Sequence, residues 1–354
     1  MRKIDSYVRT SVLNAILMVL LVLAMLDMVF ALLDQLDDMK RDYGMLQVMY
    51  YVVMSTPTRL YEYIPMATLI GCLAGLGGLA NNSELTAIRA AGVSTQRIVI
   101  STMKPAAIMM VFSLIMGEYI VPNLESISTS YRAVAQGKDT TSNNRGKGFW
   151  HREGETYMRF RAIEPNGVLH GVNLYEFDEN DRLSKMTYAP RALYQREQWI
   201  MEKVTVTEIN AFDTQVKTIP SQEWETSLTP EKLKFVAQSP AFMAISTVYN
   251  YSQYMTEQGL DGGEFELAFW KKLLMPLSTA ALVLIGISFI FGPLRSVTMG
   301  QRLFSGILVG LIYKFAVDLL GPAGLVLGFG AFWANIIPVI ICGGWGLVML
   351  RRAG

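Results

Sequence analysis

The chain has 354 residues and a net charge of +1 at pH 7; 51% of its residues are hydrophobic and only 17% are charged. Soluble domains usually carry about 25% charged residues, and here the deficit is concentrated in long apolar stretches. The composition therefore excludes an ordinary soluble protein. The nearly neutral charge provides no basic field that would attract nucleic acid.

Six stretches are long and apolar enough to cross a membrane, which takes about 20 mostly apolar residues. The first is too long for the apolar region of a signal peptide, so we expect it to be retained. In chain order, the predicted spans are 12–33, 63–80, 98–121, 273–291, 303–320 and 325–350.

Lysine and arginine in the short connecting segments predict how these spans are oriented. With six spans, one side of the membrane receives all of the following: Arg2, Lys3, Arg9, Arg89, Arg97, Arg295, Arg302, Arg351 and Arg352. The opposite side has an acidic loop at 34–42 and an uncharged loop at 321–331. We therefore expect both termini in the cytoplasm and the long middle segment outside.

The middle segment contains no span and has the pattern of short strands. Stretches rich in alternating, β-branched or aromatic residues are separated by turn residues, at a spacing typical of a sandwich or jelly roll. They are 156–161, 169–177, 183–189 and 198–209, followed by a helical pattern. The predicted fold is a membrane α-helical protein of six transmembrane helices with an inserted all-β, jelly-roll-like domain. Its expected parts are 1–122, 123–264 and 265–354.

A short segment between the second and third spans, residues 83–92, has helix signals at both ends. Ser83 is an expected N-cap and Gly92 an expected stop. A helix of two turns is too short to be stable alone, so it needs a partner surface. A cytoplasmic subunit and the bilayer surface both remain possible partners at this point. The residues expected to meet the partner are Glu84, Leu85, Ala87, Ile88, Ala91 and Gly92.

Two features inside the spans have alternative explanations. Lys314 and Asp318 are four residues apart on one predicted helix, so they are expected to pair, and Asp27 is expected to snorkel or to line a cavity. Two small-xxx-small spacings, 71/75 and 306/310, either allow close approach of helices or arise by chance among many glycines.

The motifs of several enzyme classes are missing from the sequence. The chain has no phosphate-binding GxxxxGK[ST] loop, no HExxH and no CxxC, and it has only two histidines. Both cysteines, Cys72 and Cys342, lie inside predicted spans. We therefore expect no catalytic residue, no metal site and no cofactor in this chain.

Three motifs together resemble the lipopolysaccharide-export permease family LptF/LptG. They are Asp34-Gln35-Leu36, Ser83-Glu84-Leu85 with Ala90-Ala91-Gly92, and Ser288-Phe289-Ile290-Phe291-Gly292-Pro293-Leu294-Arg295-Ser296. The order of spans and the size of the middle segment fit the family along essentially the whole chain, and the similarity is greater to its LptG branch than to its LptF branch.

The resemblance implies a permease subunit of an ATP-driven, ABC-type transporter in the inner membrane of a Gram-negative bacterium. Its implied partners are an LptF-like sister permease and an LptB-like ATPase dimer, which uses ATP and Mg²⁺ and would dock on residues 83–92. Lipopolysaccharide would pass from the outer leaflet to a periplasmic jelly-roll bridge of LptC-like and LptA-like proteins. The alternatives are the LptF subunit itself and a scaffold that transports nothing.

The resemblance also implies substrate contacts of two kinds. Basic residues would hold the phosphates of the lipid head; here they are Lys40, Arg41 and Arg132. An apolar wall on the first helix would adapt to the acyl chains; it comprises Met18, Leu21, Met25 and Met28. Directly after the Asp-Gln-Leu motif, where relatives often have basic residues, this chain has Asp37 and Asp38.

Overall fold

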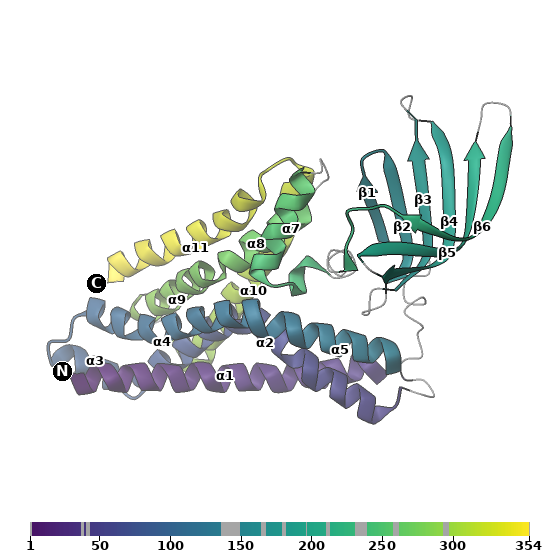
Figure 1. Ribbon diagram of the computed structural model, residues 1–354. Coiled ribbons are helices and arrows are strands. Elements are labelled where there is room, and N and C mark those ends of the chain that lie inside the picture. The colour runs from purple at the N-terminus through teal and green to yellow at the C-terminus, as the bar shows by residue number, and fades with distance from the viewer. Residues whose placement is uncertain are drawn as a thin grey trace.

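The computed structural model describes residues 2–36, 39, 43–135, 149–163, 168–178, 182–195, 197–209, 213–230, 239–257, 262–292 and 297–353. They form a bundle of long helices and one β-sheet, which lies beyond one end of the bundle (Figure 1). The two chain termini and the short helix α3 lie together at the other end of the bundle (Figure 1). Lys40 and Arg41 fall outside the described residues.

The helices before the sheet are α1 (Arg2–Leu36), α2 (Met45–Asn81), α3 (Glu84–Ala90), α4 (Thr95–Ile115), the π-helical turn η1 (Met116–Ile120) and α5 (Val121–Ala135). Those after it are η2 (Pro240–Phe242), α7 (Ile245–Glu257), α8 (Gly263–Leu273), α9 (Met275–Phe291), α10 (Met299–Val326) and α11 (Ala331–Ala353). Helices α4, η1 and α5 follow one another without a break, so the third predicted span continues well past residue 122.

Among the described residues, five helical stretches are long and apolar enough to span a membrane, and there are six when the pair α8 and α9, bent by 49°, is counted as one span. The prediction of six membrane helices is therefore confirmed. The loop predicted at 321–331 is too long, however, because α10 continues to Val326. Within the segment 123–264, α5 is continuous with the third span, and the helical pattern expected after the strands includes α7, which packs against α8 and η1.

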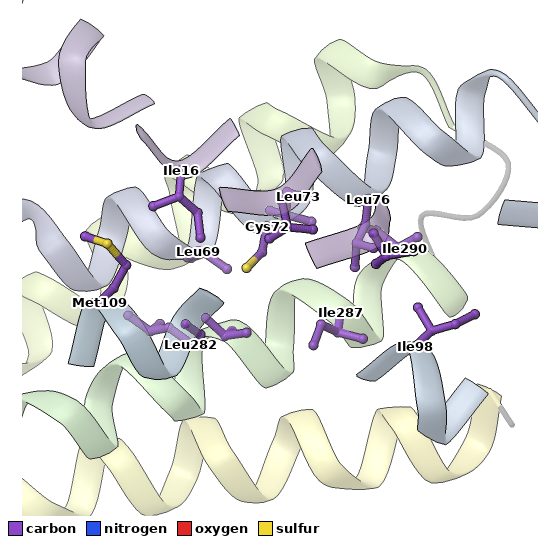
Figure 2. Packing of buried hydrophobic residues seen from close by; sticks show 14 of the residues in the cluster. Ile16, Leu69, Cys72, Leu73, Leu76, Ile98, Met109, Leu282, Ile287 and Ile290 are labelled. Carbon is purple, nitrogen blue, oxygen red and sulfur yellow. The ribbon is translucent and has the colours of Figure 1, made fainter. Parts of the chain in front are cut away.

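Helices α1 and α2 touch through their backbones. A Cβ atom at Gly71 would lie 2.5 Å from the Cα atom of Ile16, and one at Gly75 would lie 2.8 Å from the Cα atom of Val12. Close approach of this kind is what small residues permit in a membrane helix. Figure 2 shows Ile16 of α1 beside Leu69, Cys72 and Leu73 of α2, in the main apolar core. The 71/75 spacing therefore has a packing role.

The sheet contains six antiparallel strands that pair in sequence order. They are β1 (Phe149–Glu153), β2 (Thr156–Ile163), β3 (Leu169–Phe177), β4 (Leu183–Gln195), β5 (Gln198–Ile209) and β6 (Thr214–Trp224). The expected inserted all-β domain is confirmed, and the described strands form a curled meander. The sequence had indicated only the four central strands.

The curl of the sheet brings β2 close to β6. The rings of Phe160 on β2 and Trp224 on β6 have centroids 6.1 Å apart. At the end of β1, Glu153 accepts a 2.6 Å hydrogen bond from Thr226 Oγ1 and a 2.8 Å hydrogen bond from the Ser227 backbone N–H. The segment after β6 thus closes the sheet against β1.

This closure is expected to weaken in acid. Burial acts to raise the pKa of Glu153, but hydrogen bonds from Ser227 and Thr226 outweigh it and hold that pKa below its usual value. Because the folded pKa is lowered, the stabilisation is present above the unfolded pKa and is lost as the pH falls through the folded one. Glu153→Gln should cost about 1 kcal/mol at pH 7 and remove this pH dependence.

Amide hydrogen exchange of residues 226–228, corrected for the intrinsic effect of pH, measures the closure in the full chain. Glu155→Gln is the matched control, because among the described ion pairs that carboxylate pairs only with Arg152, on β1. Equal protection of residues 226–228 in the Glu153 variant and the native chain at pH 7 would contradict the prediction.

Candidate coupling and substrate-contact sites

Helix α3 is held at its end by a C-terminal motif that the sequence only partly revealed. Gly92 has φ +86°, and its N–H donates to the Arg89 carbonyl at 3.0 Å, while the Val93 N–H donates to the Ile88 carbonyl at 3.3 Å. These two bonds form a Schellman motif, which explains why glycine terminates the helix. Ser83 does precede the helix, but it has φ 60° and its side chain caps none of the described residues.

The apolar side of α3 faces the bundle. Leu85 is only 5% exposed and belongs to the main core, and Ile88 packs against the same core. Leu85 is one of the residues expected to meet the partner, but in the bundle its side chain is occupied by the main core. A helix this short needs a packing partner, and the bundle supplies it. Ala87, Ala91 and Gly92 remain exposed.

Glu84 is attached to the first helix. The Tyr7 hydroxyl on α1 donates to Glu84 Oε2 at 2.7 Å, and the Asn82 side chain donates to Glu84 Oε1 at 3.4 Å. At the other end of α3, the Arg89 guanidinium lies 5.8 Å from the ring centroid of Phe291 on α9. The short helix is thus fixed to both α1 and α9.

The expected apolar wall on α1 has three exposed members and one that packs elsewhere. Met18, Leu21 and Met25 are 70%, 53% and 60% exposed, and they lie at i, i+3 and i+7 on one face of the helix. Met28 instead packs against the small core around Tyr43 and Val48. The structure therefore brings three of these four residues together.

Of the three expected basic contacts, Arg132 is the one that the structure describes. It lies on α5 with its guanidinium 5.0 Å from the ring centroid of Tyr51 on α2, an arrangement that fixes the side chain between the two helices. The ring of the neighbouring Tyr131 lies 4.4 Å from that of Tyr50. Arg132 is therefore held against Tyr51, and the tyrosine pair beside it joins the same two helices.

The spans also contain an ion-pair chain that the sequence only partly predicted. Lys314 and Asp318 pair on α10 at 3.3 Å, as expected. Lys314 also pairs with Glu62 of α2 at 3.7 Å, and Asp318 pairs with Lys271 of α8 at 2.8 Å. These four side chains help to line a cavity of about 150 Å³ among α2, α8, α9 and α10. Charges in a membrane segment favour such pairing because they are costly alone.

Asp27 has a partner as well. Its carboxylate lies 3.3 Å from Arg59 Nη1 and accepts a hydrogen bond from the Tyr63 hydroxyl at 3.1 Å, both on α2. The pairs could not be predicted from local spacing, because the partners are 32 and 36 residues away along the chain. Among the described residues, no group of three or more His, Cys, Asp or Glu side chains could hold a metal ion.

The sequence of this chain matches a known protein family and two named relatives. Residues 6–352 match the family model described as lipopolysaccharide export system permease LptF/LptG. The LptG protein of Haemophilus influenzae is 33% identical over 341 residues, which cover 96% of this chain and 95% of the relative. The chain belongs to the LptF/LptG family. The LptG protein of Escherichia coli K12 is also 33% identical, over 95% of this chain and 94% of the relative.

Membership in the LptF/LptG family confirms the resemblance drawn from the three motifs. It identifies a family of permeases and not of nucleotide-binding enzymes. The fold agrees, because apolar helices precede and follow one inserted antiparallel sheet along the chain. Within this LptF/LptG fold, α3 is the candidate surface for coupling, and the exposed face of α1 is the candidate surface for substrate contact.

Proposed function

We propose that this chain is the LptG-type permease subunit of an ATP-driven lipopolysaccharide exporter in the inner membrane of a Gram-negative bacterium. The family match over residues 6–352 carries this proposal. The chain would extract lipopolysaccharide from the outer leaflet together with an LptF-like permease. It would then deliver the lipid to the periplasmic LptC-like and LptA-like bridge.

The proposed orientation has both termini and α3 in the cytoplasm and the sheet in the periplasm. It is supported by the grouping of the two termini and α3 at one end of the bundle (Figure 1) and by the cations near that end. Such an excess of Lys and Arg marks the cytoplasmic side. An LptB-like ATPase dimer, with ATP and Mg²⁺, would then meet the half-buried Glu84 and the exposed Ala87 of α3, together with the exposed Ala91 and Gly92 that follow this helix.

The proposed mechanism follows from the two surfaces. Methionine and leucine side chains are flexible enough to contact variable acyl chains, and Met18, Leu21 and Met25 are open for this contact. Arg132, together with Lys40 and Arg41, would hold the phosphates of the lipid head. Movement of α3, driven by closure of the ATPase pair, would compress the cavity between the two permeases and release the lipid toward the sheet.

A photo-crosslinking amino acid at residue 25 is expected to capture lipopolysaccharide in native membranes. The matched control is residue 340 on α11, because Ile340 is 59% exposed and Met25 is 60% exposed, so both positions reach lipid-sized probes equally. We expect the amount of adduct from residue 25 to exceed that from residue 340 by about tenfold. A binding free energy more favourable by about 1.4 kcal/mol at residue 25 gives that ratio.

Addition of ATP to the assembled complex should reduce the residue-25 adduct, because the lipid leaves the cavity. Equal capture at residues 25 and 340, with or without ATP, would overturn the permease function and favour a scaffold that contacts lipid only as a solvent. Immunoblotting of the crosslinked chain with an antibody to lipopolysaccharide provides the measurement.

A further inference from the structure

We propose that the first turns of α1 tie the coupling helix α3 to the substrate-contacting face of α1, with Tyr7 and Asp5 as positioning residues. The inference rests on the proposed function, because it requires an ATPase that pushes on α3. It adds the route by which that push reaches the lipid: through one continuous helix that starts beside α3 and carries Met18, Leu21 and Met25.

The first link is the hydrogen bond between Tyr7 and Glu84. Although the Tyr7 side chain is 52% exposed, its hydroxyl lies 2.7 Å from Glu84 Oε2. A carboxylate offers about four acceptor positions, so Glu84 can keep this bond and the weaker one from Asn82 while it accepts a donor from another subunit. One carboxylate on α3 can therefore join the ATPase to α1.

The second link is the ion pair between Asp5 and Arg97. Arg97 Nε lies 3.0 Å from Asp5 Oδ1 and Arg97 Nη2 lies 2.6 Å from Oδ2, so the guanidinium grips both oxygens. The Ser101 hydroxyl also donates to Oδ1, at 3.4 Å. Arg97 and Ser101 belong to α4, which follows α3 directly. Bidentate pairs of this kind fix orientation as well as distance.

The two links act on different sides of α1. Residues two apart on a helix do not face each other, so Asp5 and Tyr7 reach α4 and α3 in different directions. The first turns of α1 are thus attached to the α3–α4 hairpin at two points. Two attachments in different directions resist both sliding and rotation of α1 relative to α3.

Helix α1 is suited to carry the displacement further. It runs from Arg2 to Leu36 and contains neither proline nor glycine. By contrast, α2, α4, α10 and α11 each contain an internal proline, and α4 also leads into the π-helical turn η1. Proline and π-turns are the usual places where helices bend. A displacement of α1 at Tyr7 therefore reaches Met18, Leu21 and Met25 without an obvious hinge in between.

The test uses the whole complex in proteoliposomes: this chain, the sister permease, the ATPase, lipopolysaccharide and a soluble periplasmic acceptor. Both ATP hydrolysis and lipopolysaccharide release are measured. Tyr7→Phe removes only the hydroxyl, and we expect it to lower the lipid released per ATP by about fivefold, the effect of losing one solvent-exposed hydrogen bond of ordinary strength. ATP hydrolysis and ATPase copurification should stay within about twofold of the native values.

Tyr249→Phe is the matched control, because Tyr249 has a similar exposure of 47% and belongs to α7, a helix that lies far from α3 (Figure 1). We expect this control to leave the lipid released per ATP unchanged. In a double-mutant cycle, Tyr7→Phe should add no further loss of lipid per ATP to Glu84→Ala, because Glu84→Ala already removes the acceptor of that hydrogen bond. Asp5→Arg and Arg97→Asp should each uncouple the complex, and the double exchange should restore coupling.

Two kinds of failure are distinguishable. If Tyr7→Phe keeps the native ratio of lipid to ATP, or lowers ATPase copurification in the same proportion as lipid release, then Tyr7 is not a positioning residue and the inference is wrong, although the permease function stands. If Glu84→Lys alters neither copurification nor hydrolysis, then α3 does not receive the ATPase, and the coupling part of the proposed function fails.

Discussion

Gly71→Ala is expected to destabilise the helix bundle by about 3 kcal/mol, at the upper end for an overpacked core. The added methyl group would lie 2.5 Å from the Cα atom and 2.8 Å from the backbone nitrogen of Ile16. Backbone atoms cannot rotate away as a side chain can, so α1 and α2 must separate. Separation would open the core around Leu69, Cys72 and Leu73, which are all fully buried.

The same helix provides the control for this prediction. Gly78 also lies in α2, but a Cβ atom there would meet nothing within 4 Å, so Gly78→Ala should be neutral or slightly stabilising because glycine is a poor helix former. A thermal-unfolding series of the purified chain in one detergent compares the variants. Ile16→Ala should not rescue Gly71→Ala, because the clash involves backbone. Equal stability of the two alanine variants would contradict the close approach of α1 and α2.

The membrane helices were predictable because their signal is local. An apolar run long enough to span a bilayer has few other interpretations, and all six spans follow from such runs. The central strands β2 to β5 were recognisable because half of their residues face a core. Strand β6 was missed because it is an edge strand: apart from Trp224 and Gln222, its residues are all exposed, and it contains Pro220, which usually argues against a strand.

The candidate sites were predictable only as far as their chemistry depends on neighbours in sequence. Residues 83–92 carry their own start and stop signals, so the short helix was found. Which side of it is free depends on the bundle, and the structure shows that Leu85 is used for anchoring. The bond from Tyr7 to Glu84 joins residues 77 positions apart. No periodicity or motif within one segment could have indicated it.

The second large effect is expected at the pair of Asp27 and Arg59. Arg59→Gln should cost about 2–3 kcal/mol, below the value for a fully buried pair because the two side chains are 30% and 14% exposed. The variant leaves a carboxylate within the apolar span α1 without the cation that pairs with it, and of its described partners the neutral Tyr63 hydroxyl remains. Isolated charges at this depth are costly. Thermal unfolding of the full chain in lipid nanodiscs measures the loss.

Removing the other partner of the ion pair should lower the stability less, and this difference between the two variants tests the physical explanation. Asp27→Asn leaves Arg59 without its carboxylate, but the long arginine side chain can extend its charge toward water, which the short aspartate cannot do. The double variant Asp27→Asn with Arg59→Gln should recover most of the stability lost in Arg59→Gln, because no unpaired charge remains. If the double variant is as unstable as Arg59→Gln, then the cost comes from lost packing around residue 59, and the ion pair is not what stabilises this part of the α1–α2 contact.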